Sequence, residues 1–218
     1  EELQNYIYLS DRFGKKFGGK KTLGKFINTL APYRNYYQPH LPLFHKYGID
    51  SIEVKARIQN WENSRDKVLI DSLTTLFIRD QEGGRAGVNI MIKNDNKNAL
   101  LMKWIFENYG FPSMDKVGIF GNNDVPMHLL TFFSHMAATD YYPYFETEMR
   151  KYVSSGHCFP RDYATMVDRH YLQIRKEDIL YGMYIGYDTV IDTAQVNINR
   201  KTVGLPTIKH SSRLRKDF

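Results

Sequence analysis

Only one cysteine, Cys158, occurs in the 218 residues of this chain. A single thiol excludes a disulfide framework within the chain and any cysteine-based metal cluster. Long apolar runs are missing as well, because none approaches the roughly 20 residues that a helix needs to cross a bilayer. The sequence therefore predicts no transmembrane segment and no small disulfide-stapled scaffold.

Short motifs with a known chemistry are also missing. There is no Gly-x-Ser-x-Gly nucleophile turn and no glycine loop that would cradle a phosphate. His157 and Cys158 are neighbours in sequence, but adjacency does not make their side chains face each other. RNP, zinc-finger and helix-turn-helix patterns are absent too. Nucleophilic catalysis therefore has no recognisable triad, and nucleic acid is not an expected partner.

What the chain does have is tyrosine and positive charge. It contains 16 Tyr and 13 Phe and carries a formal net charge of +6, with Lys and Arg concentrated in Arg12–Lys25 and Lys209–Lys216. Tyrosine offers a stackable ring and a polar tip, so it suits wet grooves as well as the edges of a core. Basic ends attract anions of many kinds, or simply keep a surface solvated.

Hydrophobic periodicity predicts helices almost throughout. The clearest are a long helix from an N-cap at Ser51 to Asp80–Glu82 and a second from Asp95 or Asn96 to Tyr109. Helices joined by short loops indicate antiparallel pairs, stacked as a bundle or a short right-handed tetratricopeptide-like superhelix. We expect an all-α fold and a single domain, 1–218, in which 1–50 is a Tyr- and basic-rich helical extension and 51–208 is the helical core.

Polar residues interrupt the apolar pattern of the later helices. Burying such groups without partners costs roughly 2–7 kcal/mol each, so they either satisfy one another or line a site. They are Arg79-Asp80-Gln81, Arg85, Ser134-His135, Asp168-Arg169-His170, Tyr181-Gly182-Met183-Tyr184 and Val203-Gly204-Leu205-Pro206.

A series of short motifs follows the order found in one known family. They are Asp80-Gln81 with Arg85, Gly110-Phe111-Pro112, Val117-Gly118, His135, Asp168-Arg169, Tyr181-Gly182 and Gly204-Leu205-Pro206. In these motifs the chain, over about residues 66–208, resembles the uncharacterised bacterial helical family DUF6624. The resemblance implies a shared helical fold.

Arg85 follows Gln81 by one residue more than in the family's pattern, and three further features depart from it. Ser134 stands where Gln is usual, Met-Ala-Ala follows His135 in place of an early Asp, and Met183-Tyr184 replace Thr-Gln. These losses shift the expectation from catalysis towards binding. In its basic, Tyr-rich, all-helical character the chain is also similar to the secreted haemophores of the Hus type, which would imply a tetratricopeptide-like fold holding porphyrin in an apolar groove.

The spacing of histidines argues against a metal chelate on one helix. His128 and His135 are seven residues apart, roughly 10 Å along a helix axis, and His40 and His45 form no recognisable pair. We therefore expect no metal site. The strongest acid–base set is Asp80, Arg85, His135, Asp168 and Arg169, in which a carboxylate would orient His135 as a base. A buried network of Asp–Arg pairs that locks the helices explains the same residues.

Our hypothesis from the sequence is a haem- or porphyrin-binding protein that captures a planar aromatic ligand in an apolar, Tyr-rich groove. The expected ligand-binding residues are Arg85, His135, Arg169, Tyr181, Met183 and Tyr184. The alternatives are an enzyme of unknown reaction using Asp80, His135 and Asp168, and a helical interaction scaffold. No cofactor is required, and haem or porphyrin is the candidate ligand.

The start at Glu1 rather than Met predicts a processed form from which an export signal has been removed. That prediction favours a secreted protein, or one associated with the cell surface or outer membrane, with an outer-membrane receptor as a candidate partner. The alternative location is the cytoplasm.

Overall fold

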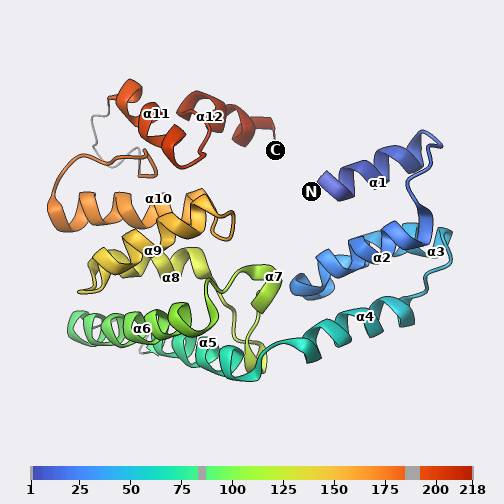
Figure 1. The fold of residues 1–218 in the computed structure, drawn as a ribbon, viewed down its shortest axis with the longest axis horizontal. Helices are drawn as coiled ribbons and strands as arrows, with labels where there is room; N and C mark the ends of the chain where they lie inside the picture. Colours follow the sequence, from blue (N-terminus) through green and yellow to red (C-terminus); the bar gives the residue numbers. More distant parts are fainter. Residues whose placement is uncertain (1, 83–86, 185–191, 218) are drawn as a thin grey trace. The chain divides into compact units, whose positions relative to one another are not determined.

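The computed structural model describes residues 2–82, 87–184 and 192–217 (Figure 1). Across these residues the chain forms α-helices joined by short 3-10 and π-helical turns, and extended backbone pairs only in isolated bridges. The all-α prediction is therefore confirmed, while the superhelical arrangement stays a prediction. None of the described helices is both long and apolar enough to span a membrane.

The helices group into two compact units. Unit 1 comprises residues 1–70 and 113–124, and unit 2 comprises 71–112 and 125–218. The predicted N-terminal extension, 1–50, thus packs with further residues from two later segments. Each unit has buried apolar residues of its own, and a single domain over 1–218 stays a prediction.

Unit 1 contains α1 (Glu2–Arg12), α2 (Gly19–Leu30), α3 (Leu41–Lys46), α4 (Ser51–Ser64) and the short α7 (Met114–Val117). A 3-10 segment at Ala31–His40 contacts α2, α3, α4 and α7. The core is fully buried at Ile7, Leu23, Ile27, Phe44 and Val54.

Within unit 1, residues 113–124 are held to the first 70 residues by hydrogen bonds to their backbone. The Trp61 indole N–H donates to Asp115 O (3.2 Å), and the Arg65 guanidinium donates to Val117 O (3.1 Å) and Phe120 O (2.9 Å). Gly118 has φ +80°, and a Cβ there would lie 2.9 Å from the Trp61 ring. The Val117-Gly118 motif thus has a structural explanation, since only glycine suits this backbone and this close approach.

The long helix predicted over Ser51 to Asp80–Glu82 is wrong, because it is divided into α4 and α5 (Lys67–Asp80). The first helix ends at Ser64, and Asp66 begins the second by accepting a hydrogen bond from Leu69 N–H (2.9 Å), which is an N-cap contact. The predicted cap at Ser51 is displaced by one residue, since Asp50 accepts the bond from Glu53 N–H (2.8 Å). The apolar spacing continues across this break, so it does not reveal the N-cap at Asp66.

In unit 2, α6 (Val88–Tyr109) begins well before the Asp95 or Asn96 start that the sequence predicts. Asp and Asn indicate helix starts, but here Asn94, Asp95 and Asn98 lie inside the helix and are buried. Two of them bind the backbone of α5: Asn94 Nδ2 donates to Arg79 O (3.2 Å) and Asn98 Nδ2 to Leu76 O (3.2 Å). Asp95 is therefore a buried residue inside α6 and does not begin the helix.

The rest of unit 2 is formed by α8 (Leu129–His135), α9 (Tyr142–Ser154), α10 (Pro160–Arg169), α11 (Thr193–Thr202) and α12 (Ile208–Asp217). Helix α10 packs against α8 and α9, as Figure 1 shows, and continues into a π-helical turn at His170–Arg175. The aromatic core of the unit contains Phe106, Phe111, Phe132, Phe133 and Phe145.

Candidate functional site

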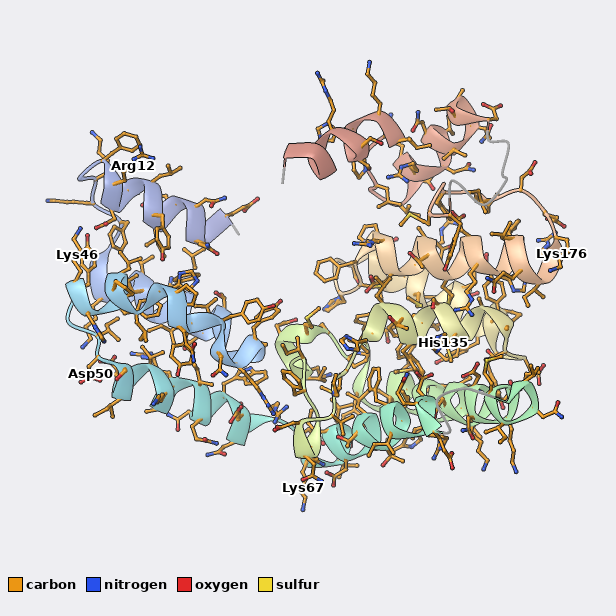
Figure 2. The ribbon with its side chains drawn as sticks, turned by 180° about the vertical axis from the view of Figure 1, so that it is seen from behind. Arg12, Lys46, Asp50, Lys67, His135 and Lys176 are labelled. Atoms are coloured by element: carbon orange, nitrogen blue, oxygen red, sulfur yellow. The ribbon has the colours of Figure 1, made fainter. Side chains whose placement is uncertain are left out.

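Three helices of unit 2 bring two carboxylates and an imidazole together. Asp80 ends α5, Asp95 lies inside α6 and His135 ends α8. Their exposed fractions are only 3%, 6% and 8%. One carboxylate oxygen of each Asp and one ring nitrogen of His135 all lie within 4.8 Å of one another. We call these three residues the Asp80 cluster; Figure 2 shows His135 among the packed helices of unit 2.

The closest contact in the Asp80 cluster joins His135 to Asp80. His135 Nδ1 lies 2.8 Å from Asp80 Oδ1, although the two residues are 55 positions apart in sequence. The amide of Gln81 donates to the other carboxylate oxygen of Asp80 at 2.6 Å. A carboxylate at Nδ1 fixes the tautomer and orientation of an imidazole ring, and Nε2 is then the basic nitrogen. Asp80 therefore holds His135 in one defined orientation.

Amide side chains hold the end of α5 against α6 beside the Asp80 cluster. Asn98 Oδ1 accepts a hydrogen bond from the Arg79 guanidinium (3.1 Å), and Asn94 Nδ2 donates to Glu82 Oε2 (3.0 Å). These contacts add to the bonds that Asn94 and Asn98 make to the α5 backbone. The positions of Asp80 and Asp95 are thus fixed by a layer of hydrogen bonds outside the cluster.

Asp168, the other carboxylate of the predicted acid–base set, is engaged with backbone. It is fully buried, and its Oδ1 accepts from Leu180 N–H and Tyr181 N–H, both at 2.8 Å. Its Oδ2 accepts from Met183 N–H at 2.7 Å. Burial raises the pKa of Asp168, while the three backbone N–H groups and Arg200 act in the opposite direction. This carboxylate fixes the 180–183 loop.

Arg200, on α11, binds the 180–183 loop through its side chain. The sequence did not indicate this role. Its guanidinium donates to Tyr181 O (2.7 Å), Pro206 O (2.5 Å) and Ser211 Oγ (2.8 Å). Leu205 N–H in turn donates to Arg200 O (2.9 Å). The Tyr181-Gly182 and Gly204-Leu205-Pro206 motifs are therefore two ends of one buried hydrogen-bond network.

Of the predicted ligand-binding residues, His135 belongs to the Asp80 cluster, and Tyr181 and Met183 belong to the 180–183 loop. Arg169 donates to Ser134 Oγ and to Gln173 Oε1, each at 3.0 Å. Tyr181 is buried with its ring edge-on to Tyr163, and the Met183 sulfur lies 3.9 Å from Arg200. Tyr184 is half-buried, and Arg85 lies outside the described residues.

Asp95 is the residue of the Asp80 cluster that the sequence did not single out. Its signal was a polar Asn94-Asp95-Asn96 triplet, which is read equally well as a helix start. Only the pairing of α6 with α5 and α8 shows that the triplet lies in the interior.

Comparisons with known proteins add no relative, since no family model, no curated protein and no solved structure matches this chain. The resemblance to DUF6624 therefore stays a prediction that rests on the motifs alone.

Proposed function

We propose that unit 2 binds a divalent metal ion at the Asp80 cluster. The observation that carries the proposal is the mutual approach of three ligand atoms, within 4.8 Å, from three different helices. Oxygen and nitrogen ligands of a tetrahedral ion stand about 3.3 Å apart, given metal–ligand distances near 2.0–2.1 Å. To bind one ion, the ligand atoms of Asp80, Asp95 and His135 must close to about this separation from within 4.8 Å, and bonds to the ion would replace any hydrogen bond between the ligating atoms.

The electrostatics of the Asp80 cluster favour a cation. Two buried carboxylates this close to each other attract a cation, whatever further contacts Asp80 and Asp95 make. A divalent ion offsets both charges at once. A set of two carboxylates and one imidazole suits borderline and hard ions such as Mn²⁺, Fe²⁺, Co²⁺ and Zn²⁺. Three protein ligands also leave a coordination position for water or a substrate, which is the arrangement typical of catalytic sites.

Isothermal titration of chelator-treated protein with Zn²⁺ and with Mn²⁺ tests the proposal. We expect binding of one ion per chain, weaker at low pH because protons compete for all three ligands. Asp95→Asn should weaken binding at least about 100-fold, since loss of a direct ligand exceeds the 10–100-fold typical of outer-shell changes. The exposed Asp178→Asn is the matched control and should bind as the parent does. Equal affinity in D95N and D178N would contradict the metal site.

A second candidate function, favoured by the 2.8 Å contact between His135 Nδ1 and Asp80 Oδ1, is acid–base catalysis without a metal. In that case His135 acts through Nε2, and Asp95 has no direct role. Chelated protein would be assayed with chromogenic ester and phosphodiester substrates. Activity that survives Asp95→Asn but is lost in His135→Gln would support this candidate, whereas activity restored only by added metal would favour the first.

The haem hypothesis stays a prediction from the sequence. Four of its residues, His135, Arg169, Tyr181 and Met183, form contacts with other parts of unit 2. A depression of about 660 Å³ in unit 2 is lined by Glu146, Arg150 and Tyr163, and Tyr163 is the ring that contacts Tyr181. Titration with haemin tests the hypothesis, with Soret absorption and tyrosine fluorescence as readouts. If both the Soret absorption and the tyrosine fluorescence stayed unchanged at micromolar haemin, the hypothesis would be contradicted. The outer-membrane receptor and the secreted location remain expectations attached to this hypothesis.

A further inference from the structure

Unit 1 carries an unbalanced run of positive charge. Six cationic residues and no carboxylate lie between Arg12 and Lys25, which spans the end of α1, the connecting loop and most of α2. Part of this charge is compensated from elsewhere, since Lys20 pairs with Glu53 (2.9 Å). Lys46 from α3, at the same end of the unit as Arg12 in Figure 2, pairs with Asp11 (2.7 Å).

Lys15 and Lys16 keep their charge uncompensated. Both are exposed, and neither forms an ion pair or hydrogen bond through its side chain with any residue that the structure describes. They line an open depression of about 500 Å³ together with Phe17, Lys46 and Tyr47. The loop thus presents two free ammonium groups beside a third that is neutralised by Asp11.

The helix that leads into this loop exposes apolar side chains on one side. Tyr6, Leu9 and Phe13 are 52%, 54% and 65% exposed. Their spacing of three and four residues places them on one face of a helix, and Phe13 N–H still donates to Leu9 O (3.0 Å). Ile7, on the other side of α1, is fully buried in the core of unit 1. An apolar ridge therefore runs along α1 and ends at the basic loop.

We propose that this ridge and loop dock on an anionic phospholipid surface. An amphipathic helix lies in a bilayer interface with its apolar side chains at the acyl boundary and its lysines among the headgroups. Tyr6, Leu9 and Phe13 supply the apolar part, and Lys15 and Lys16 supply the charge that complements anionic headgroups. A helical ridge with an aliphatic member suits an acyl boundary better than it suits stacked bases, which favours lipid over nucleic acid. The proposal concerns unit 1 and is independent of the metal site in unit 2.

Cosedimentation of the full chain with large vesicles tests the lipid proposal. We expect binding to phosphatidylcholine vesicles that contain phosphatidylserine, and little binding to phosphatidylcholine alone. Lys15→Gln with Lys16→Gln should weaken binding about 25-fold, because each cation near an anionic surface contributes about fivefold. The charge-matched control, Lys67→Gln with Lys176→Gln, should change binding no more than about twofold.

The apolar contribution has its own matched pair of variants. Phe13→Ser should weaken binding to the anionic vesicles about tenfold, because the variant loses the favourable free energy of moving the Phe ring out of water. Phe159→Ser, at a position 63% exposed in unit 2, is the control and should leave binding unchanged. Circular dichroism confirms that each variant is folded. Equal binding to neutral vesicles, no binding to anionic vesicles, or binding of single-stranded oligonucleotide instead of vesicles would overturn the proposal.

Discussion

Two of the buried carboxylates of unit 2, Asp168 and Asp80, have opposite surroundings. Asp168 accepts three backbone N–H bonds from one short loop, and backbone donors cannot change their protonation or leave. Asp80 instead contacts the side chains of His135 and Gln81, and a second carboxylate, Asp95, lies nearby. Burial alone therefore does not identify a functional acid. The chemical nature of its partners separates a structural anchor from a site.

The largest expected effect follows from removing the anchor. Asp168→Ala leaves three backbone N–H groups without their acceptor in a buried loop, which should lower the free energy of unfolding by about 4 kcal/mol. Urea denaturation followed by circular dichroism measures the loss. The exposed Asp178→Ala is the control and should cost little. A loss in D168A as small as in D178A would mean that the loop finds other acceptors.

The next effect concerns the metal. Ligand binding to the folded state alone should raise the free energy of unfolding by about 2.7 kcal/mol at a metal concentration of 100 Kd. We expect this gain in the parent and in Asp168→Asn, and its absence in Asp95→Asn. Denaturation with and without Mn²⁺ or Zn²⁺ measures it. The same gain in all three proteins would erase the distinction between the anchor and the site.

A smaller effect is a change in pH dependence. Because burial places the pKa of folded Asp168 above its unfolded value, the folded state holds this proton more tightly. The contribution of Asp168 to stability therefore falls as pH rises from the ordinary Asp value through the raised pKa. Asp168→Asn removes that fall, so its free energy of unfolding relative to the parent should increase with pH over this window. A difference that is flat with pH would count against the raised pKa.

The smallest effect is expected from the other histidine near α8. His128 is exposed just before the helix, and His128→Ala should change the free energy of unfolding by no more than about 0.5 kcal/mol. It should also leave metal affinity unchanged. His135→Ala, measured beside it by calorimetric titration, should abolish the metal signal. If the two variants lost affinity equally, His135 would have no special place in the site.

The fold class followed from apolar periodicity, but several element boundaries did not. The break at Asp66 and the early start of α6 both depend on Asp or Asn side chains whose role is set by the partner helix. Asp80 and His135 were predicted as one site and do meet. Asp95 was not predicted, because nothing in the sequence shows that α6 turns this side towards α5 and α8. The sequence assigned Asp168 to the same acid–base set, since no sequence pattern shows that its carboxylate oxygens accept hydrogen bonds from backbone N–H groups.

The return of residues 113–124 to unit 1 has a consequence for biosynthesis. Ile119 N–H donates to Pro32 O, and the Trp61 and Arg65 side chains bind the same segment. On the ribosome, the first 70 residues emerge long before this segment does, so unit 1 stays incomplete until part of unit 2 has been made. Neither unit can be excised as one continuous fragment, because each consists of two stretches that are separated in the sequence.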